Sequence, residues 1–531
     1  MSNFFHWAQV QPERVVLVQA DTGASHRAGD IAQRAKQVAC WLVAQGLQPG
    51  DCIAVLLENR PEIVELVLAA REAGLYVAVI STHLTAAEVA YIVKDSGSRL
   101  MLVSSVTCSS AQEALRMHAL PCYSVDNDTP QVPSLTAAMA DAPPAGVDFS
   151  AYPLGRDLLY SSGTTGRPKG IKKPLLGAQY RQQIDPEVAA WMQHMGFDEK
   201  AVYLSPAPMY HAAPLRYTLR TLDVGGSAVI MGRFDAQQAL ALIEKYRVTH
   251  SQWVPTMLGR LLKLPDEVKA RYELSSHRVA IHAAAPCPVP VKQGILDWWG
   301  DILLEYYAGS EACGTTMITS EQWRRKPGSV GRAITGKLRI VGEDDEELAP
   351  GKIGRVYFEG GPKFEYLNDA AKTRSAFNAR GWATYGDIGY VDEEGYLFLS
   401  DRRADLILSG GVNVYPQEIE LALAGHASVE EVAVVGVPHE DFGEQPLAVI
   451  VLKPGADGSE ALARDIVALA ASQLSKVKLP ARVVFVPELP RLETGKLLRR
   501  VLKDRYREQV DVGFDVRHAS PISAKPSLQK A

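Results

Sequence analysis

The first hundred residues alternate between helix and strand patterns, and this alternation constrains the fold more than any other feature. Apolar residues recur at helical spacing over Ile31–Leu42, and Thr85-Ala-Ala-Glu88 is a capping box that opens a helix. Short apolar runs typical of buried strands occur at 52–57, 76–80 and 100–103. Strands that alternate with helices form a parallel sheet with helices on both faces, so we predict an α/β fold.

Later parts of the chain have different patterns, and 531 residues exceed the roughly 250 to 300 that one core serves. The α/β alternation resumes over 203–322, and short glycine-punctuated segments typical of antiparallel hairpins follow Gly328. We predict an N-terminal domain over 1–401, made of parallel α/β layers and a small antiparallel β-barrel-like subdomain. A small α+β domain over 402–510 and a loose tail over 511–531 complete the prediction.

Composition excludes several classes of partner. The net charge of −5 and the pI near 6.2 give no electrostatic footprint for nucleic acid. No run of 18 or more apolar residues predicts a transmembrane segment, and the start lacks a signal-peptide pattern. The six cysteines include no Cys-x-x-Cys pair, as expected for reduced thiols. We therefore expect a cytoplasmic protein, and a homodimer is compatible with the sequence.

A loop rich in glycine and hydroxyl residues, Tyr160–Gly170, follows a strand pattern at Leu158-Leu159. Glycine lets the backbone approach a ligand closely, while hydroxyls, amides and an ammonium group favour anions. The loop is not a Walker A motif, because Lys169 follows Pro168 and precedes Gly170. It predicts a polyphosphate site formed by Ser161, Ser162, Gly163, Thr164, Thr165, Gly166 and Lys169.

Four further motifs follow this loop in order, and together the five resemble the core motifs of one family. The four are Tyr306–Glu311, Tyr385-Gly386-Asp387, Asp401–Asn413 and Pro490–Lys496. In this order they resemble the adenylate-forming (AMP-binding) superfamily, in its acyl-CoA synthetase or fatty-acid–CoA ligase branch. The resemblance runs over nearly the whole chain and also implies that the C-terminal domain is mobile, with its pivot near Ala404.

The resemblance implies a ligase that uses ATP, Mg²⁺ and coenzyme A. A carboxylic acid attacks the α-phosphorus of ATP to give an acyl adenylate and pyrophosphate, and CoA then displaces AMP to give acyl-CoA. One alternative is an enzyme that loads a separate carrier protein. Another is a nucleotide-binding module without catalysis, which the acidic and basic residues of the motifs disfavour.

The resemblance also implies roles for individual residues of the nucleotide site. Ser310 contacts the α-phosphate, Glu311 is the Mg²⁺ ligand, and Tyr307 lies against adenine. A carboxylate and an arginine, Asp387 and Arg402, bind the ribose. Lys496 bridges the acid and the α-phosphate during adenylation. Two glycines, Gly410 and Gly411, leave room for the pantetheine arm of CoA.

The acid itself is expected to bind in a pocket of small and apolar residues, by similarity to the family. Small side chains leave volume and larger ones form walls, which suits a hydrophobic acid. The residues implied are His211, Trp253, Met257, Ala283, Ala284, Ala308 and Gly309.

Overall fold

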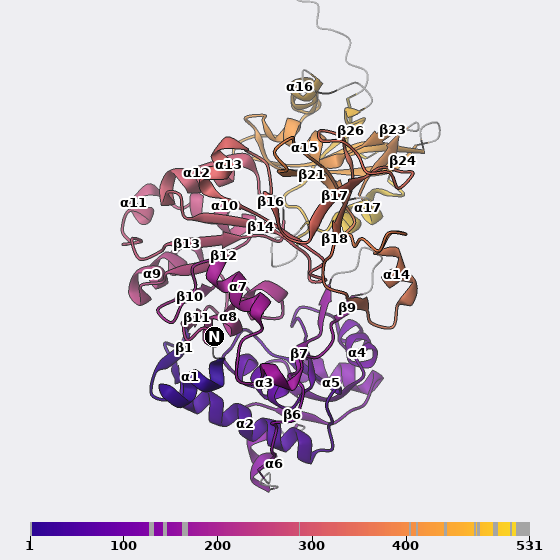
Figure 1. The fold of residues 1–531 in the computed structure, drawn as a ribbon. Helices are drawn as coiled ribbons and strands as arrows, with labels where there is room; N and C mark the ends of the chain where they lie inside the picture. The colour runs from indigo at the N-terminus through magenta and orange to yellow at the C-terminus, as the bar shows by residue number, and fades with distance from the viewer. Residues whose placement is uncertain are drawn as a thin grey trace, which may run out of the picture. The chain divides into compact units, whose positions relative to one another are not determined.

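Figure 1 shows the computed structural model, which divides into two compact units. The structure describes residues 3–126, 132–141, 146–161, 168–285, 287–402, 405–409, 412–439, 443–471, 474, 478–491, 497–509 and 512–516. The first unit comprises Met1–Leu338 and Phe358–Tyr385, and the second comprises Arg339–Tyr357 and Gly386–Ala531. In the described part of the chain, no helix is long and apolar enough to cross a membrane.

The first unit contains a nine-stranded sheet of order β16-β15-β14-β13-β12-β10-β11-β1-β2. From β14 to β1 every pairing is parallel, and antiparallel strands close both ends. The bounds are β1 (Val15–Gln19), β2 (Ser25–Arg27), β10 (Val202–Ser205), β11 (Ser227–Ile230), β12 (His250–Trp253), β13 (Val279–His282), β14 (Leu303–Tyr307), β15 (Thr315–Thr319) and β16 (Arg332–Thr335).

A second sheet in this unit has five strands, all parallel, in the order β6-β5-β3-β4-β7. Its strands are β3 (Cys52–Leu56), β4 (Tyr76–Val79), β5 (Ser98–Val103), β6 (Cys122–Ser124) and β7 (Arg156–Asp157). The three strands predicted from apolar runs are therefore confirmed as β3, β4 and β5. The predicted capping box is also present, with Thr85 and Glu88 closing the first turn of α4 (Ala86–Asp95) reciprocally.

Alternate residues of β3 enter different cores, which confirms that both faces of this sheet are covered. Ile53 and Val55 belong to the core that includes α2 (Ala28–Ala44) and α3 (Glu62–Glu72). Ala54 and Leu56 belong to a separate core shared with α4 and α5 (Cys108–Met117). Successive strand residues point to opposite faces, so a strand buried on both faces is a continuous apolar run.

The remaining helices of the first unit connect or flank the strands. They are α1 (Phe4–Val10), α6 (Leu135–Asp141), α7 (Pro186–His194), α8 (Ala212–Asp223), α9 (Ala236–Tyr246), α10 (Pro255–Leu262), α11 (Asp266–Lys269), α12 (Val289–Trp299), α13 (Ser320–Arg325), α14 (Ala370–Ser375) and the 3₁₀ turn η1 (Ala178–Tyr180).

A small antiparallel sheet of order β19-β9-β8 carries the ends of the predicted phosphate loop. Its strands are β8 (Leu159–Ser161), β9 (Lys169–Lys172) and β19 (Glu365–Tyr366). Ser161 pairs directly with Lys169, so the loop is the connection of a hairpin. Residues 162–167 lie outside the described part of the chain, and the predicted phosphate contacts of Ser162, Gly163, Thr164, Thr165 and Gly166 stay predictions.

The antiparallel region predicted after Gly328 is a four-stranded sheet of order β17-β18-β20-β21. Its strands are β17 (Lys337–Val341), β18 (Gly354–Glu359), β20 (Asp387–Val391) and β21 (Leu397–Arg402). In the described part of the chain, a mixed six-stranded sheet follows, with three helices. Its strands are β22 (Ile407–Ser409), β23 (Val412–Val414), β24 (Val429–His439), β25 (Gly443–Leu452), β26 (Arg482–Phe485) and β27 (Phe514–Asp515), and the helices are α15 (Pro416–Ala424), α16 (Glu460–Ala471) and α17 (Arg499–Tyr506).

The compact units do not divide at the predicted boundary between residues 401 and 402, because 339–357 and 386–401 group with the C-terminal residues. The boundary at 402 was predicted as the limit of a moving domain, and that prediction, like the pivot at Ala404, stays a prediction. The loose tail over 511–531 needs a correction at its start. Phe514–Asp515 pairs with β26, and the Phe514 ring lies 5.8 Å from that of Phe485.

A buried ion pair inside the first unit gives a prediction about stability. Lys292 of α12 donates from Nζ to Glu305 of β14 at 2.5 Å, and their side chains are 1% and 7% exposed. Replacing Glu305 with glutamine leaves an uncompensated buried ammonium, so we expect Glu305→Gln to destabilise this unit by about 3 to 5 kcal/mol. Urea denaturation followed by tryptophan fluorescence measures the loss. The double variant Lys292→Met/Glu305→Leu should recover most of it; a double variant as unstable as Glu305→Gln would contradict the explanation.

Candidate active site

The tight turn after β14 displays two of the predicted nucleotide contacts. Ala312 has a left-handed backbone with φ of 55°, and its N–H donates to the Gly309 carbonyl at 3.0 Å. A Cβ on Gly309 would lie 2.4 Å from Cε1 of Tyr385 and 2.6 Å from a Glu311 carboxylate oxygen, so only glycine fits. Ser310 and Glu311 are half-buried on this turn, beyond the carboxyl end of a parallel strand, where α/β sheets bind ligands.

Aromatic side chains flank the same turn. The rings of Tyr307 and Tyr385 are 5.5 Å apart and nearly perpendicular, and Phe358 lies 6.3 Å from Tyr307. The Tyr385 hydroxyl donates to the Gly314 carbonyl at 2.7 Å and accepts from the Gly314 N–H at 3.2 Å. These bonds fix the ring beside Gly309. These rings form an aromatic surface beside the turn. The stacking of adenine on Tyr307 stays a prediction.

Tyr366 joins two predicted site residues that are far apart in the sequence. Its hydroxyl donates to Oε1 of Glu311 at 2.8 Å, and the Lys169 ammonium lies 5.9 Å from the centroid of its ring. Tyr366 ends β19, which pairs with β9, the strand that begins at Lys169. Sequence reasoning missed Tyr366, because its role depends on this strand pairing and not on a motif.

A second lysine stands near Lys169. Burial, followed by the neighbouring Lys372 on α14, lowers the pKa of the Lys169 ammonium. Figure 1 draws α14 beside β9, in agreement with this pairing of charges. Two ammonium groups close together repel each other, which raises the free energy of their charged forms. A polyphosphate is the kind of ligand whose negative charge offsets this repulsion. Lys372 was also missed from the sequence.

The residues around Glu311 fit a magnesium ion that arrives with ATP. Among the described residues, no group of three or more His, Cys, Asp or Glu side chains could hold a metal. Mg²⁺ commonly binds one or two carboxylates together with substrate phosphates and water, so a single carboxylate is a suitable ligand. Tyr366 engages Oε1 of Glu311, and this hydrogen bond orients the other oxygen of the carboxylate.

The predicted acid-binding residues lie in different environments. His211 immediately precedes α8, is half-buried, and has its ring 4.4 Å from that of Tyr210. Trp253 and Met257 are buried, and the Trp253 indole donates to Ser251 Oγ at 2.6 Å. Ala283 is buried, whereas Ala284 is exposed and has φ of 75°. Ala308 is half-buried in the turn after β14. Contact of these residues with an acid stays a prediction.

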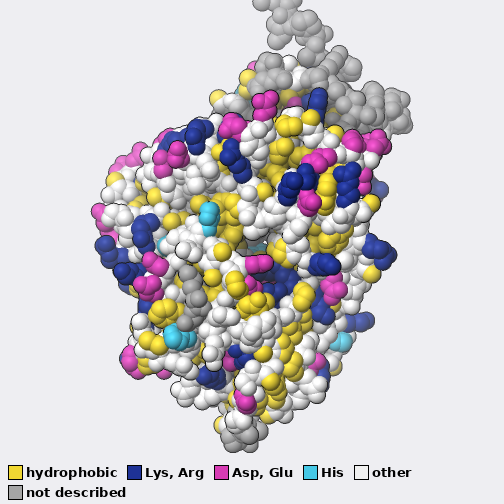
Figure 2. Space-filling model, viewed as in Figure 1, with side chains coloured by type: hydrophobic (Ala, Val, Ile, Leu, Met, Phe, Trp, Pro, Cys, Tyr) yellow, Lys and Arg dark blue, Asp and Glu magenta, His cyan; other side chains and the backbone are white. Residues whose placement is uncertain are grey.

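A cationic cluster near this region was missed from the sequence. Arg216 and Arg220 lie one turn apart on α8, five and nine residues after His211, and Arg216 donates to Asp157 at 2.7 Å. The i, i+4 spacing of two arginines on a helix was the available signal. Lys and Arg side chains gather near the middle of the face drawn in Figure 2, close to where Figure 1 draws α7 and β9.

In the second unit, the predicted ribose pair is aligned in the backbone. Asp387 and Arg402 are direct partners in the antiparallel β20–β21 ladder, and Asp387 is 7% exposed. Such register brings the two residues to one place on the sheet. Their contact with ribose stays a prediction. Gly410, Gly411 and Lys496 lie outside the described residues, so their predicted roles stay predictions.

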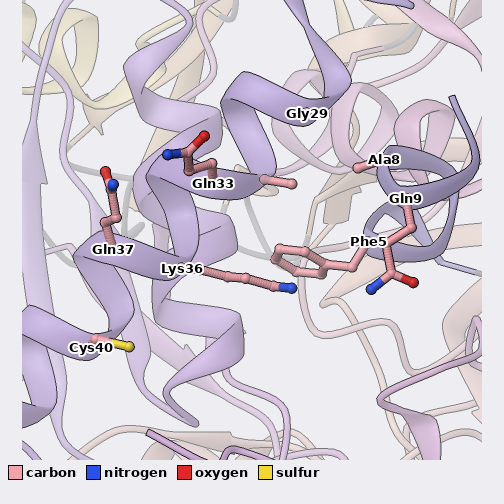
Figure 3. A pocket seen from close by; sticks show the side chains of 9 residues that line it. Phe5, Ala8, Gln9, Gly29, Gln33, Lys36, Gln37 and Cys40 are labelled. Atoms are coloured by element: carbon pink, nitrogen blue, oxygen red, sulfur yellow. The ribbon is translucent and has the colours of Figure 1, made fainter. Parts of the chain in front are cut away.

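A surface pocket of about 420 Å³ lies between α1 and α2, away from all of these residues. Figure 3 shows Lys36 of α2 pointing toward Phe5 of α1, and the ammonium lies 5.6 Å from the ring centroid. The pocket contains none of the predicted site residues. It is a groove between two helices and not part of the candidate active site.

Comparison with curated proteins finds relatives over almost the whole chain. The long-chain-fatty-acid–CoA ligase FadD13 of Mycobacterium tuberculosis is 33% identical, covering 94% of this chain and 97% of that protein. The 2-succinylbenzoate–CoA ligase of Bacillus pumilus is 31% identical over 94% and 97% of the two chains. The fatty acid–[acyl-carrier-protein] ligase ScoC of Streptomyces coeruleorubidus is 31% identical over 89% and 90%.

Solved structures and family models agree with these relatives. ATP-bound MatB from Rhodopseudomonas palustris superposes with a TM-score of 0.80 at 30% identity, covering 96% of this chain and 99% of that one. The family model "AMP-binding enzyme" matches residues 4–363, and "AMP-binding enzyme C-terminal domain" matches residues 418–496. The predicted superfamily and fold class are thus confirmed, and the chain belongs to the AMP-binding enzyme family.

Proposed function

We propose that this AMP-binding enzyme activates a carboxylic acid with ATP and transfers the acyl group to CoA, releasing AMP and pyrophosphate. The observation that carries the proposal is the arrangement around Tyr366, which contacts Glu311 on one side and lies beneath Lys169 on the other. A carboxylate and an ammonium are thereby held at one place, beside a glycine turn at the end of a parallel strand. This arrangement suits a magnesium-bound polyphosphate.

The chemistry requires two anions, the acid and ATP, to react with each other. Lys169 and Lys372 supply positive charge to the phosphates, and Ser310 supplies a hydroxyl donor on the turn. Mg²⁺ bound with ATP would neutralise phosphoryl oxygens as a Lewis acid, with Glu311 among its ligands. The turn fixes these groups before the acid arrives, so they need little reorganisation during the reaction.

The acceptor thiol has a second candidate. ScoC is a ligase for an acyl carrier protein, and this chain matches it over 89% of its length. Transfer to the phosphopantetheine thiol of a carrier protein uses the same adenylate. A fatty acid is one candidate substrate, since FadD13 acts on long-chain fatty acids, but the 2-succinylbenzoate ligases are almost equally similar.

A panel of acids tests the proposal directly. Purified protein is incubated with ATP, Mg²⁺ and each acid in three parallel reactions. One contains CoA, one contains a phosphopantetheinyl carrier protein, and one contains no acceptor. Pyrophosphate release is measured, and acyl-AMP and acyl-CoA are identified by mass. We expect acid-dependent pyrophosphate release and acyl-CoA formation. Absence of both across fatty, aromatic and dicarboxylic acids would overturn the proposal, and thioester formation only on the carrier protein would favour the second acceptor.

The proposal extends to conditions in the cell. We propose that the enzyme works in the cytoplasm, where ATP and CoA are present, with Mg²⁺ as its metal and as a homodimer. Cell fractionation, a magnesium titration of the purified protein and light scattering test these three points in turn.

The second half-reaction gives its own prediction, at Gly411. By resemblance to the family, we expect the pantetheine arm to pass Gly410 and Gly411, where any Cβ would crowd it. We expect Gly411→Leu to form acyl-AMP at a near wild-type rate but to lose thioester formation. Single-turnover assays measure the two steps separately. Equal loss in both steps would show that Gly411 serves the fold or the nucleotide instead.

A further inference from the structure

An uncompensated positive charge lies on α8, beside an ion pair that is already complete. Arg216 donates from Nε and Nη2 to one oxygen of Asp157, at 3.2 and 2.7 Å. Burial alone would raise the pKa of Asp157, but Arg216 holds it at about 2. The carboxylate of β7 is therefore ionised and paired with Arg216 through one of its oxygens.

Arg220, one turn further along α8, has no such partner. Among the residues that the structure describes, no hydrogen bond or ion pair reaches its guanidinium, although the residue is half-buried. Burial and then the neighbouring Arg216 lower the pKa of Arg220. A guanidinium in such a place costs free energy unless an anion pairs with it.

Lys173 adds to the same excess of positive charge. It follows β9 directly, and burial together with Arg216 lowers the pKa of its ammonium to about 7. Arg156, which precedes Asp157, also belongs to this neighbourhood and has Asp185 3.9 Å from its guanidinium. Arg156 and Arg216 thus lie within ion-pair distance of a carboxylate. Among the described residues, Arg220 and Lys173 have no carboxylate at that distance, although the charge of Asp157 influences both.

The excess charge lies close to the predicted reaction centre. Tyr306 directly precedes Tyr307 in β14. Its ring lies 6.3 Å from the ring of Tyr217, a residue that lies between Arg216 and Arg220 on α8. The Trp191 ring of α7 meets Tyr306 edge-on at 5.5 Å. The Glu311 carboxylate is near enough to influence Arg216. Segments that carry the predicted acid and nucleotide contacts therefore converge on the cluster, with aromatic rings beside it.

We infer that Arg220 binds a second carboxylate, carried by the acid that this enzyme activates at its other end. The inference rests on the proposed function and narrows the substrate to an acid with an apolar body and two carboxylates. Trp191 and Tyr306, which are both half-buried, contact the apolar body, and Asp157 pairs with Arg216 while Arg220 remains available. The sequence analysis predicted a hydrophobic acid, and this inference adds a second carboxylate to that acid.

Matched pairs of acids test the inference. Each pair consists of a monocarboxylic acid and the dicarboxylic acid of the same chain length or ring system, and acid-dependent ATP–pyrophosphate exchange gives kcat/KM. A charge-assisted hydrogen bond contributes about 1.5 to 3 kcal/mol, so we expect at least one dicarboxylate to be preferred roughly 10- to 150-fold. Monocarboxylates preferred throughout would overturn the inference and leave the proposed ligase intact.

Variants of Arg220 identify the group responsible. We expect Arg220→Gln to abolish the preference, measured as the ratio of kcat/KM for the dicarboxylate to kcat/KM for its matched monocarboxylate, mainly through a raised KM for the dicarboxylate. Arg220→Lys should retain part of the preference. Arg260→Gln, on the exposed side of α10, is the matched control. Equal loss for both acids, or a raised KM for CoA alone, would overturn the assignment. No exchange with any acid would instead contradict the proposed function, and thermal unfolding checks each variant's fold.

Discussion

Replacing Lys496 with alanine is expected to slow formation of the acyl adenylate by at least roughly 10² to 10³, by analogy with the loss of one oxyanion donor. The resemblance of Pro490–Lys496 to the family motif makes Lys496 the cation between the acid and the α-phosphate. Negative charge develops there only during adenylation, so its loss raises the barrier of the first step. The second step, attack of CoA on a preformed adenylate, does not use this charge.

Two assays separate the steps for the Lys496→Ala variant. Single-turnover pyrophosphate release reports adenylation, and transfer from synthetic acyl-AMP to CoA reports thioester formation. Arg505→Ala, an exposed position on the following helix α17, is the matched control and should leave both rates unchanged. If Lys496→Ala slowed both steps equally, the lysine would serve the fold or the binding of CoA and not adenylation.

Local patterns were enough to predict much of the fold. β3, β4 and β5 are apolar on both faces, so their short runs are visible without any knowledge of their neighbours. The capping box at Thr85 depends on residues within one turn of each other. The parallel arrangement followed from their alternation, because parallel strands need helical crossovers. Proximity along the chain was the common property of these successes.

The contacts that define the site depend on distant pairings. Tyr366 reaches Glu311 across 55 positions, because β19, which ends at Tyr366, pairs with β9. Arg220 lies near Tyr306 because α8 packs on β10 and β11, which belong to the same sheet as β14, and no spacing in the sequence indicates this. The pairing of β27 with β26 was missed for the same reason. Motifs predicted residues that are expected to contact substrate, and the structure was needed to find neighbours such as Tyr366 that hold them.

Glu311 and Tyr366 offer a matched pair of variants with different expected results. Glu311→Gln keeps the size of the side chain and an oxygen that accepts from Tyr366, but removes the negative charge that a hard cation requires. We expect adenylation to slow by at least roughly 10², the loss typical of removing one electrostatic stabiliser, and the Mg²⁺ concentration for half-maximal rate to rise. Pyrophosphate release across a magnesium titration measures both.

Tyr366→Phe removes only the hydroxyl that orients Glu311. Loss of a partner that orients a metal ligand typically weakens metal affinity by roughly 10- to 100-fold, so the same titration should shift in the same direction with a smaller loss of maximal rate. Because Phe keeps the ring beneath Lys169, the phosphate side of the site is unchanged. A normal magnesium dependence in Glu311→Gln would remove Glu311 from the metal site, whereas a normal dependence in Tyr366→Phe alone would limit Tyr366 to packing.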